Sequence, residues 1–507
     1  MRRLLIGFLL AGLGVLVGAG LVGTGAGATT PGASPGASAA GPVPQVEGPV
    51  TGGNGDIVVQ TTGFDLADVG YEASEWFVSG TASSFTSSAP LTEDGEWEVT
   101  EGDTAPYRTR IVVYRPVDPE RFNGTVVVEW LNVTAGLDAG PTWSMTHTEL
   151  IRRGYAWVGV SAQVAGVEGG GASIAASQAL KLADPVRYGS LTIASDSFSY
   201  DIYSQVGRLL RGRAPVDVLE LRPRVLLATG ASQSAFRLTT YIDAVHPLHR
   251  VYDGYFVHSR GGGGAPLAQA PQARIEAPSP TLIRRDVDAP VMVFTAEGDL
   301  FGLDAVVAAQ RDSRGYRDWQ AAGTAHYDTY GLGIAQTDTG DGAADVALFD
   351  SMLAPPQQLF GGLFTCGSPI NAGPHHYVAS AAIAATNRWV VDGVAPPRAP
   401  RIEVDAAGTD AVRDEHGIAV GGIRTPQVDA PVAALSGVGQ TGSTFCSLFG
   451  TTRPFDAPTL ASEYATNRAF VQQWTAATRR AVKAGFMLPA DAEHVIAAGR
   501  QSTIGAP

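Results

Sequence analysis

Short runs rich in β-branched residues alternate with longer amphipathic stretches along most of this chain. The runs predicted to be strands are Arg110–Tyr114, Thr125–Trp130, Ala156–Ser161, Arg224–Thr229, Val251–Val257, Val291–Thr295 and Tyr316–Ala321. The stretches predicted to be helices include Asp201–Arg211, Ser234–Val245 and Asp304–Arg311. Nearly continuous apolar strands separated by helices are typical of a mostly parallel sheet with helices on both faces. The pattern therefore predicts an α/β fold.

The composition is that of a large globular protein. The chain has 507 residues, of which 45% are hydrophobic, so it can bury a sizeable core and is neither disordered nor collagen-like. Lys and Arg number 35 and Asp and Glu 49, which gives a net charge of −14. An acidic chain without a basic cluster in its body is unsuited to binding phosphate backbones, so nucleic acid is excluded as a partner.

The N-terminal 28 residues have the pattern of an export signal. Two arginines at positions 2 and 3 precede an apolar run over residues 4–22, and Ala26-Gly27-Ala28 fits a small-residue cleavage site. An uncleaved anchor is the alternative, because the run approaches the roughly 20 residues that span a bilayer. The glycines in the run and the cleavage site favour cleavage. We therefore expect a secreted or cell-envelope protein with no stable membrane span after signal cleavage.

Downstream of the signal, the composition divides the chain into three parts. Residues 29–49 are mostly Gly, Ala, Ser and Pro and are predicted to form a disordered linker. Residues 50–394 carry the α/β pattern and are expected to form the core. Residues 395–507 are predicted to pack on this core as a C-terminal extension. Helical spacing of apolar residues predicts a helix over residues 462–484 of the extension.

The chain has two cysteines, Cys366 and Cys446. In an exported protein an even pair of cysteines usually forms a structural disulfide. A nucleophilic or metal-binding thiol is the alternative, but neither cysteine lies in a motif with ligand spacing. We therefore expect a disulfide between the two that staples the C-terminal region.

Candidate chemistry begins at Ser232. The predicted strand Arg224–Thr229 leads into Gly230-Ala231-Ser232-Gln233-Ser234 and then into a predicted helix. A sharp strand–turn–helix that exposes a serine hydroxyl needs small residues two positions before and after the serine, where the two backbones approach each other. Gly230 and Ser234 supply them, although Ser234 departs from the second glycine of the usual G-x-S-x-G pattern. An ordinary Ser-rich helix N-cap is the alternative interpretation.

An acid and a histidine follow Ser232 in the chain. Glu297 and Asp299 come directly after the predicted strand Val291–Thr295, and His326 lies in a loop of small residues after the next strand. A serine hydroxyl is a weak nucleophile, so a histidine must take its proton while a carboxylate orients and stabilises that histidine. His326 is the predicted base. Asp299 is the favoured acid and Glu297 the alternative, with the other carboxylate in a turn or supporting role.

A catalytic serine of this kind also needs N–H donors for the oxyanion. The backbone N–H of Gln233, at the N-terminus of the predicted helix, is the first predicted donor. The second is expected from the loop that follows the strand Thr125–Trp130. In that loop Asn132 or Val133 would present a backbone N–H, and the side chain of Asn132 is the alternative donor.

The other histidines are interpreted as structural or as lining a pocket. His375 and His376 lie in the first turn of a predicted apolar helix, and His258 ends a predicted strand. Zinc is disfavoured because no carboxylate or cysteine stands at matching spacing and neighbouring helical side chains point in different directions. The Gly-rich stretches at 169–171 and 261–264 lack the features of a phosphate loop. We therefore expect neither a metal nor an organic cofactor.

Several segments, taken in order, resemble one known family. The matching motifs are Val128–Val133, Gly154–Gln163, Phe198–Ile202, Gly230–Ser234, Tyr252–Gly254, His258–Arg260 and Gly323–His326. They resemble the large bacterial proteins called alpha/beta hydrolase domain-containing, a branch of the α/β-hydrolase superfamily in which the order serine, acid, histidine is usual. The resemblance spans roughly residues 55 to 500. It implies catalytic roles for Ser232, one carboxylate and His326, and it implies hydrolysis of carboxylic esters.

The sequence thus predicts a secreted serine hydrolase of the carboxylesterase type, acting on a small-molecule or polymeric ester through an acyl-enzyme. One alternative is an acyltransferase, in which an alcohol instead of water takes the acyl group. Another is a non-catalytic secreted binding protein on a retained hydrolase fold. The C-terminal extension, together with two loops over residues 164–197 and 261–285, is expected to roof the pocket. The two loops are then expected to set the size of the substrate.

Overall fold

The computed structural model describes residues 41–170, 178–212, 217–359 and 364–506. The predicted signal peptide, most of the predicted linker and part of the first predicted roof loop lie outside the described residues. The remainder of the linker contains strand β1 (Gln45–Glu47), which pairs antiparallel with strand β2 (Tyr71–Thr86). Regular structure therefore begins before residue 50, because backbone pairing at a sheet edge does not require large apolar side chains.

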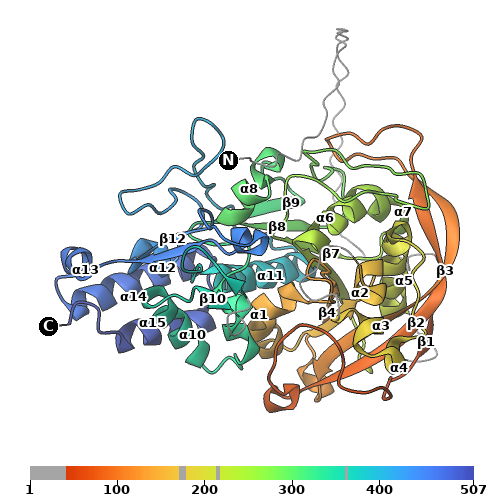
Figure 1. Ribbon diagram of the computed structural model, residues 1–507, viewed down its shortest axis with the longest axis horizontal. Helices are drawn as coiled ribbons and strands as arrows, with labels where there is room; N and C mark the ends of the chain where they lie inside the picture. The colour runs from red at the N-terminus through yellow and green to blue at the C-terminus, as the bar shows by residue number, and fades with distance from the viewer. Residues whose placement is uncertain (1–40, 171–177, 213–216, 360–363, 507) are drawn as a thin grey trace, which may run out of the picture. The chain divides into compact units, whose positions relative to one another are not determined.

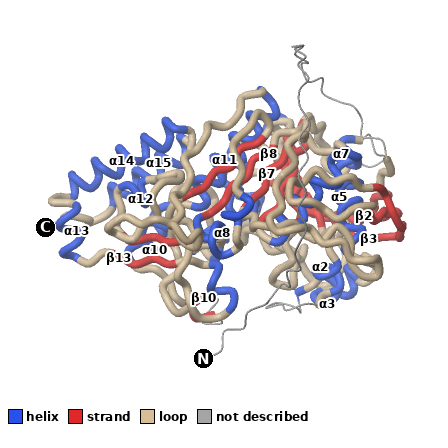
Figure 2. Tube along the Cα trace, turned by 90° about the horizontal axis from the view of Figure 1, so that it is seen from above, coloured by secondary structure: helices blue, strands red, loops and turns tan. Residues whose placement is uncertain are grey.

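A nine-stranded sheet has the order β1-β2-β3-β5-β4-β6-β7-β8-β9 (Figure 1, Figure 2). The remaining strands of this sheet are β3 (Thr100–Pro116), β4 (Thr125–Trp130), β5 (Ala156–Val160), β6 (Val225–Ala231), β7 (Gly254–His258), β8 (Val291–Ala296) and β9 (Tyr316–Ala321). Strands β1, β2, β3 and β5 pair antiparallel, and β5, β4, β6, β7, β8 and β9 pair parallel. The predicted mostly parallel sheet is confirmed, and each predicted strand occurs near its expected bounds.

The long hairpin of β2 and β3 was not predicted beyond the segment Arg110–Tyr114. The two strands pair along nearly their whole length, with an irregularity between Ser83 and Phe85. Small polar residues such as Ser83 and Ser84 are buried in β2, so no run of β-branched residues marks it. A strand whose inward positions hold serines gives a weak pattern of hydrophobic alternation.

Helices and small sheets complete the chain. The helices are α1 (Pro141–Arg152), α2 (Val164–Glu168), α3 (Leu180–Ala183), α4 (Pro185–Tyr188), α5 (Ser199–Arg211), α6 (Gln233–Thr240), α7 (His246–His249), α8 (Glu297–Gly302), α9 (Thr329–Leu332), α10 (Ala343–Leu353), α11 (His375–Asp392), α12 (Pro426–Asp429), α13 (Ala457–Glu463), α14 (Asn467–Ala484) and α15 (Pro489–Gln501). Two-stranded sheets are formed by β10 (Gln358–Leu359) with β11 (Phe364–Thr365) and by β12 (Ala433–Ser436) with β13 (Thr451–Pro454).

Both faces of the central sheet are covered. Val126 and Val128 of β4 belong to the hydrophobic cluster that contains the apolar residues of α5 and α6. Val127, between them, belongs to a second cluster with the apolar residues of α1 and α11. Because successive side chains of a strand point to opposite faces, β4 is buried on both sides, which explains its continuous apolar run.

Two of the predicted helices form and the third does not. Helix α5 confirms the first, and the predicted helix Ser234–Val245 is α6 continued by a π turn over Tyr241–Val245. The prediction of a helix over Asp304–Arg311 is wrong, since only a 3₁₀ turn over Ala305–Ala308 is present. Asp304 has a left-handed backbone with φ 56° and Ala309 is extended, so no longer helix can form between them.

The C-terminal extension packs on α10. Figure 1 shows α12, α14 and α15 gathered beside α10, on the opposite side of the fold from β2 and β3, and Figure 2 agrees. The helix predicted over 462–484 is α14, which begins only at Asn467 because the Thr466 side chain caps its first turn. Trp474 of α14 is buried and lies 5.3 Å from the ring of Phe349 in α10. The extension therefore shares one hydrophobic cluster with the core.

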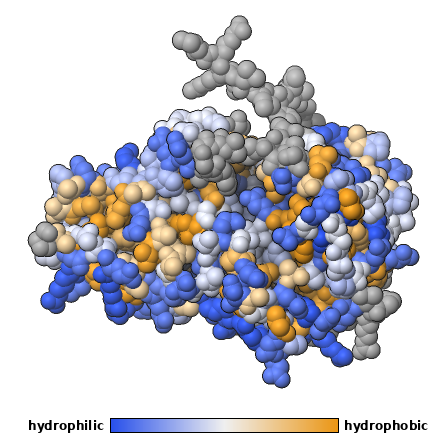
Figure 3. All heavy atoms as spheres, turned by 60° about the horizontal axis from the view of Figure 1, so that its bottom comes forward, coloured by the Kyte–Doolittle hydropathy of each residue, from blue (hydrophilic) through white to orange (hydrophobic). Residues whose placement is uncertain are grey.

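The surface drawn in Figure 3 mixes hydrophilic and hydrophobic side chains. In the described ranges the large apolar residues that remain exposed come from many segments, namely Val43, Val117, Leu182, Val186, Leu248, Val307, Val391, Val394 and Val412. Scattered exposed apolar residues are normal for a globular protein. None of the helices in the described ranges combines the length and the apolar composition needed to cross a bilayer.

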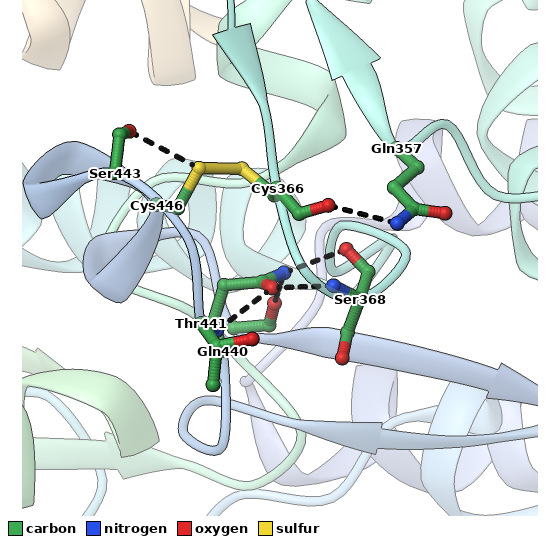
Figure 4. Close-up of a disulfide and its surroundings, with 8 residues drawn as sticks. Gln357, Cys366, Ser368, Gln440, Thr441, Ser443 and Cys446 are labelled. Atoms are coloured by element: carbon green, nitrogen blue, oxygen red, sulfur yellow. Dashed lines mark hydrogen bonds between the residues drawn. A yellow bond between two sulfur atoms is a disulfide. The ribbon is translucent and has the colours of Figure 1, made fainter.

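Cys366 and Cys446 form a disulfide, as predicted (Figure 4). The bond joins the residues that follow β11 to a turn of the extension. Beside it, the Ser368 N–H donates to the Gln440 side chain at 2.8 Å, and the Gln440 amide donates back to the Ser368 carbonyl at 2.9 Å. One covalent bond and a pair of hydrogen bonds therefore attach the extension to the segment that precedes α11.

Removing the disulfide in the double variant Cys366→Ser, Cys446→Ser is expected to lower the free energy of unfolding. The two cysteines are separated by 80 residues, and closing a loop of that size stabilises a protein by about 4–5 kcal/mol in the chain-entropy treatment. Urea unfolding beside the unaltered protein measures the difference. Ser443→Ala, which removes only a hydroxyl at 3.3 Å from the Cys446 sulfur, is the control. Equal stability of the double variant and the control would contradict the prediction.

Candidate active site

Ser232 lies at a sharp turn between β6 and α6. Its backbone has φ 58° and ψ −122°, a strained conformation for a residue with a side chain. The Ser232 N–H donates to the His258 carbonyl at 3.1 Å, and the Ser232 carbonyl accepts from the Ala235 N–H at 2.8 Å. The side chain remains partly exposed. The turn thus has the strand–serine–helix geometry predicted from the sequence around Ser232.

The small residues on either side of Ser232 meet each other. A Cβ atom at Gly230 would lie 2.7 Å from the Ser234 carbonyl oxygen and 3.2 Å from the Ser234 Cβ. Ser234 is buried, and its hydroxyl has no hydrogen-bond partner in the described part of the chain. Ser234 therefore serves this turn by its small size, which explains why a serine stands where the usual pattern has glycine.

Comparing Ser234→Ala with Gly230→Ala should show that the turn requires the absence of a side chain at Gly230 and does not require the Ser234 hydroxyl. Ser234→Ala removes a hydroxyl without a partner, so the free energy of unfolding should stay within about 0.5 kcal/mol of the unaltered value. Gly230→Ala forces a Cβ against the α6 backbone and should cost about 1–3 kcal/mol, the usual range for overpacking. Urea unfolding of both variants measures this, and a harmless Gly230→Ala would contradict the close approach.

His326 contacts both Ser232 and Asp299. The Ser232 hydroxyl lies 2.8 Å from His326 Nε2, and His326 Nδ1 lies 2.5 Å from Asp299 Oδ1. A carboxylate only accepts, so Nδ1 carries the proton and Nε2 is free to accept from Ser232. The second oxygen of Asp299 accepts from the Ala296 N–H at 2.7 Å, which fixes the carboxylate. The carboxyl ends of β6, β8 and β9 meet at one edge of the sheet, and they bring the three side chains together.

Glu297, the alternative acid, points elsewhere. Its side chain is fully buried and accepts from the Gly323 N–H at 2.8 Å on one oxygen. The other oxygen accepts from the Ser436 hydroxyl and the Gly437 N–H, both at 3.1 Å. Of the two carboxylates that the sequence left open, the one in contact with the imidazole of His326 is therefore Asp299.

The predicted oxyanion donors differ in their availability. The Asn132 N–H donates to the Ala139 carbonyl at 2.8 Å, and the Asn132 side chain donates to the Ala231 carbonyl at 2.9 Å. Within the described residues the backbone N–H groups of Val133 and Gln233 have no acceptor. Asn132 thus ties its loop to the residue before Ser232, and of the predicted donors the backbone amides of Val133 and Gln233 are the ones without an acceptor in the described part of the chain.

A buried ion-pair network holds the loop that carries Val133, and the sequence did not reveal it. Arg110, fully buried in β3, contacts Asp138 of this loop at 2.9 Å and Glu75 of β2 at 2.8 Å. Asp138 also accepts from the Ser161 hydroxyl. A buried charge without its partner is strongly destabilising. The only signal in the sequence was a charged residue at the start of an otherwise apolar strand.

A pair of buried histidines lies beneath the His326 loop. His375 Nδ1 lies 2.9 Å from the Ala325 carbonyl, so this nitrogen donates and His375 Nε2 must accept. The partner at 2.7 Å is His258 Nε2, which therefore donates, and His258 Nδ1 accepts from the Thr142 hydroxyl at 3.3 Å. Burial lowers the pKa of His258 well below its usual value and that of His375 to about 4. Both imidazoles are neutral and buried, which favours the structural one of the two interpretations left open for His258 and His375.

Acid should destabilise the folded chain through this pair. The folded-state pKa values of His258 and His375 are lowered, whereas histidine in an unfolded chain titrates near pH 6.5. The unfolded chain therefore binds more protons below pH 6.5, and stability is lost as the pH falls toward 4. For His375 alone the loss between pH 7 and pH 5 is about 2 kcal/mol. Urea unfolding at both pH values measures it, and His375→Gln should lose less; an equal loss would contradict this account.

The other candidate residues are not brought to Ser232. His376 stacks on Tyr330 with ring centroids 3.7 Å apart, and neither ring nitrogen has a hydrogen-bond partner within the described ranges. Across the same ranges, no group of three or more His, Cys, Asp or Glu side chains is arranged to hold a metal ion. His376 is therefore part of the packing between α9 and α11.

The two predicted roof loops are both bound by α6. Arg237 of this helix donates to Asp196 of the loop 164–197 at 3.0 Å and to Gln269 of the loop 261–285 at 3.2 Å. Arg237 is itself buried. The helix that begins after Ser232 therefore fixes the described parts of both loops relative to the site, and their role in setting substrate size stays a prediction.

The arrangement around the sheet defines the class of protein. A serine between β6 and α6, an acid after β8 and a histidine after β9, on a mostly parallel sheet with helices on both faces, are the features of an α/β hydrolase. A family model described as an alpha/beta hydrolase domain matches residues 46–497, and the chain belongs to this family. The resemblance noted in the sequence is thereby confirmed. No curated protein matches the chain.

Solved structures of other α/β hydrolases resemble parts of the chain. A glucuronoyl esterase from Solibacter usitatus is 12% identical, with 55% of this chain and 72% of that chain covered and a TM-score of 0.26. A serine hydrolase without a lid from Xanthomonas campestris is 14% identical, with 46% and 84% covered and a TM-score of 0.24. The activity in each of these names is that of the named protein.

Proposed function

We propose that the chain is a serine hydrolase that cleaves carboxylic esters, with Ser232 as nucleophile, His326 as base and Asp299 as acid. The observation that carries the proposal is the continuous line of contacts from Asp299 through His326 to Ser232, at 2.5 Å and 2.8 Å. Nucleophile, base and orienting acid within hydrogen-bond reach are what serine catalysis requires. The strained turn that presents Ser232 gives further support.

The chemistry follows from these contacts. Ser232 Oγ attacks the ester carbonyl while its proton moves to His326 Nε2, and Asp299 stabilises the imidazolium that forms. The backbone N–H groups of Gln233 and Val133 receive the oxyanion. The imidazolium then protonates the departing alcohol, and a water activated by His326 releases the acid from the acyl-enzyme.

The neutral state of the buried histidine pair is compatible with the proposed proton transfers through His326. His258 and His375 lie beneath the His326 loop and are uncharged, and the tautomers are set by the acceptor at the Ala325 carbonyl. A positive charge on this histidine pair would repel the imidazolium that forms on His326 and disfavour its formation. A buried pair that stays neutral therefore leaves His326 as the proton carrier of the site.

We further propose that the protein acts outside the cytoplasm. Residues 1–28 have the pattern of a cleaved export signal. The Cys366–Cys446 disulfide supports this, because such bonds form and persist in oxidising compartments.

Labelling with a fluorophosphonate probe tests the proposed nucleophile. Protein without residues 1–28 should be labelled, and Ser232→Ala and His326→Ala should abolish labelling because the first lacks the attacking oxygen and the second lacks the base. Asp299→Asn should slow hydrolysis of p-nitrophenyl esters by about 10⁴-fold, since an amide favours the wrong imidazole tautomer. Ser351→Ala, which removes a hydroxyl that donates to the Ala347 carbonyl within α10, is the control that should leave labelling unchanged.

The outcomes distinguish the alternatives. Absence of label on folded, unaltered protein would overturn the serine mechanism and favour a binding protein. Label together with transfer of the acyl group to added alcohol, at the expense of free acid, would identify an acyltransferase instead of a hydrolase. Esters of increasing chain length then test whether the roof loops limit the acyl group.

A further inference from the structure

The carboxylate of Glu297 joins three segments that are far apart in the sequence. Glu297 begins α8, one oxygen accepts from Gly323 in the His326 loop, and the other accepts from Ser436 and Gly437 in the extension. Arg413, also of the extension, pairs with this second oxygen at 3.1 Å. A fully buried carboxylate needs such partners, because an unpaired charge in the interior is costly.

The backbones of the three segments also touch directly. A Cβ atom at Gly437 would lie 2.2 Å from the Gly298 nitrogen and 2.4 Å from the Thr324 carbonyl oxygen. A Cβ atom at Gly298 would lie 2.7 Å from the Gly437 carbonyl oxygen and 3.0 Å from the His326 nitrogen. Only glycine fits at these positions, so the extension lies against the peptide that carries His326.

Further contacts hold the other side of the His326 loop. The Tyr327 N–H donates to the Leu448 carbonyl of the extension at 3.2 Å. The Asn371 side chain donates at 3.1 Å both to the Gly323 carbonyl and to the Ser436 carbonyl. The loop is therefore bound by the extension before and after His326, and Cys446 of the same segment carries the disulfide (Figure 4).

We propose that Glu297 is a positioning residue for His326 and that the C-terminal extension completes the active site through Ser436 and Gly437. The inference rests on the proposed function of Ser232, His326 and Asp299. Glu297 touches neither Ser232 nor the imidazole; it acts by holding the backbone on which His326 stands. Displacing a catalytic group by about 1 Å can lower the rate about 100-fold, so a loosened loop should act on turnover.

Replacing the Glu297 carboxylate by an amide should break its contact with the His326 loop while keeping its contacts with the extension. The oxygen that faces Ser436, Gly437 and Arg413 has three donors, and the oxygen that faces Gly323 has one. A glutamine side chain keeps only one oxygen acceptor, and we expect this oxygen to stay with the three donors of the extension. Its NH₂ group then meets the Gly323 N–H, donor against donor, so the contact with the His326 loop is lost.

The experiment compares Glu297→Gln and Gly437→Ala with two matched controls. Asp429→Asn makes the same acid-to-amide change at a carboxylate of the extension whose ion pairs, among the described residues, are with Arg424 and Arg480. Gly302→Ala adds a Cβ on α8 that meets nothing within 4 Å. The readouts are kcat and KM for a p-nitrophenyl ester, the rate of fluorophosphonate labelling, and hydrogen exchange of the peptide that contains residues 323–327.

We expect kcat and the labelling rate of Glu297→Gln and Gly437→Ala to fall about 10- to 100-fold with KM within about twofold, since the acting geometry and not substrate binding is disturbed. Exchange at residues 323–327 should rise, and both controls should stay within about twofold in kcat. Ser436→Ala, which removes one hydroxyl donor, is the mild third variant should the others fold poorly, and it should lower kcat about two- to fivefold.

The inference is overturned if folded variants keep kcat within about twofold of the unaltered protein, or if KM rises in step with the fall in kcat. It is likewise overturned if Asp429→Asn loses as much as Glu297→Gln. Absence of labelling in the unaltered protein overturns the proposed function. In that case hydrogen exchange still tests the role of Glu297: unchanged exchange at residues 323–327 in Glu297→Gln would show that Glu297 does not hold the His326 loop.

Discussion

The backbone of Ser232 is the constraint on which the site depends. A residue with a side chain holds φ 58° and ψ −122° only where its surroundings leave no alternative. Those surroundings are the close approach of Gly230 to α6, the His258 carbonyl that accepts from Ser232, and the Asn132 amide that binds the preceding carbonyl. The neighbouring strands β4 and β7 thus fix the turn from both sides.

Buried polar groups support the two loops that face this turn. Arg110 and Asp138 hold the loop with Val133, and His258 and His375 hold the loop with His326. Each network is almost fully satisfied, and satisfied buried networks favour a single arrangement of the groups that they join. The apolar clusters hold the helices on the two faces of the sheet, while these polar networks position the loops at its edge.

The sequence predicted the parallel strands and the turn at Ser232, because short-range patterns of residues determine both. Apolar runs marked the parallel strands because those strands are buried on both faces, and the small residues around Ser232 marked the turn because they must be small to form it. The choice between Glu297 and Asp299 lay beyond such patterns. Both stand in one short helix after β8, and only the directions of the two side chains separate them. The long β2–β3 hairpin and the partner of Arg110 depend on pairing between distant segments, which residue spacing does not encode.

The contact of Gly437 with Gly298 and Thr324 can form only late in synthesis, because Gly437 lies near the C-terminal end of the chain. Ribosomal synthesis delivers N-terminal segments first, so β6 and Ser232 emerge well before the part of the extension that seats the His326 loop. On the proposed role of the extension, a partly made chain carries a serine without a positioned base. On that proposal, full activity appears only once the extension has been made and has packed against the His326 loop.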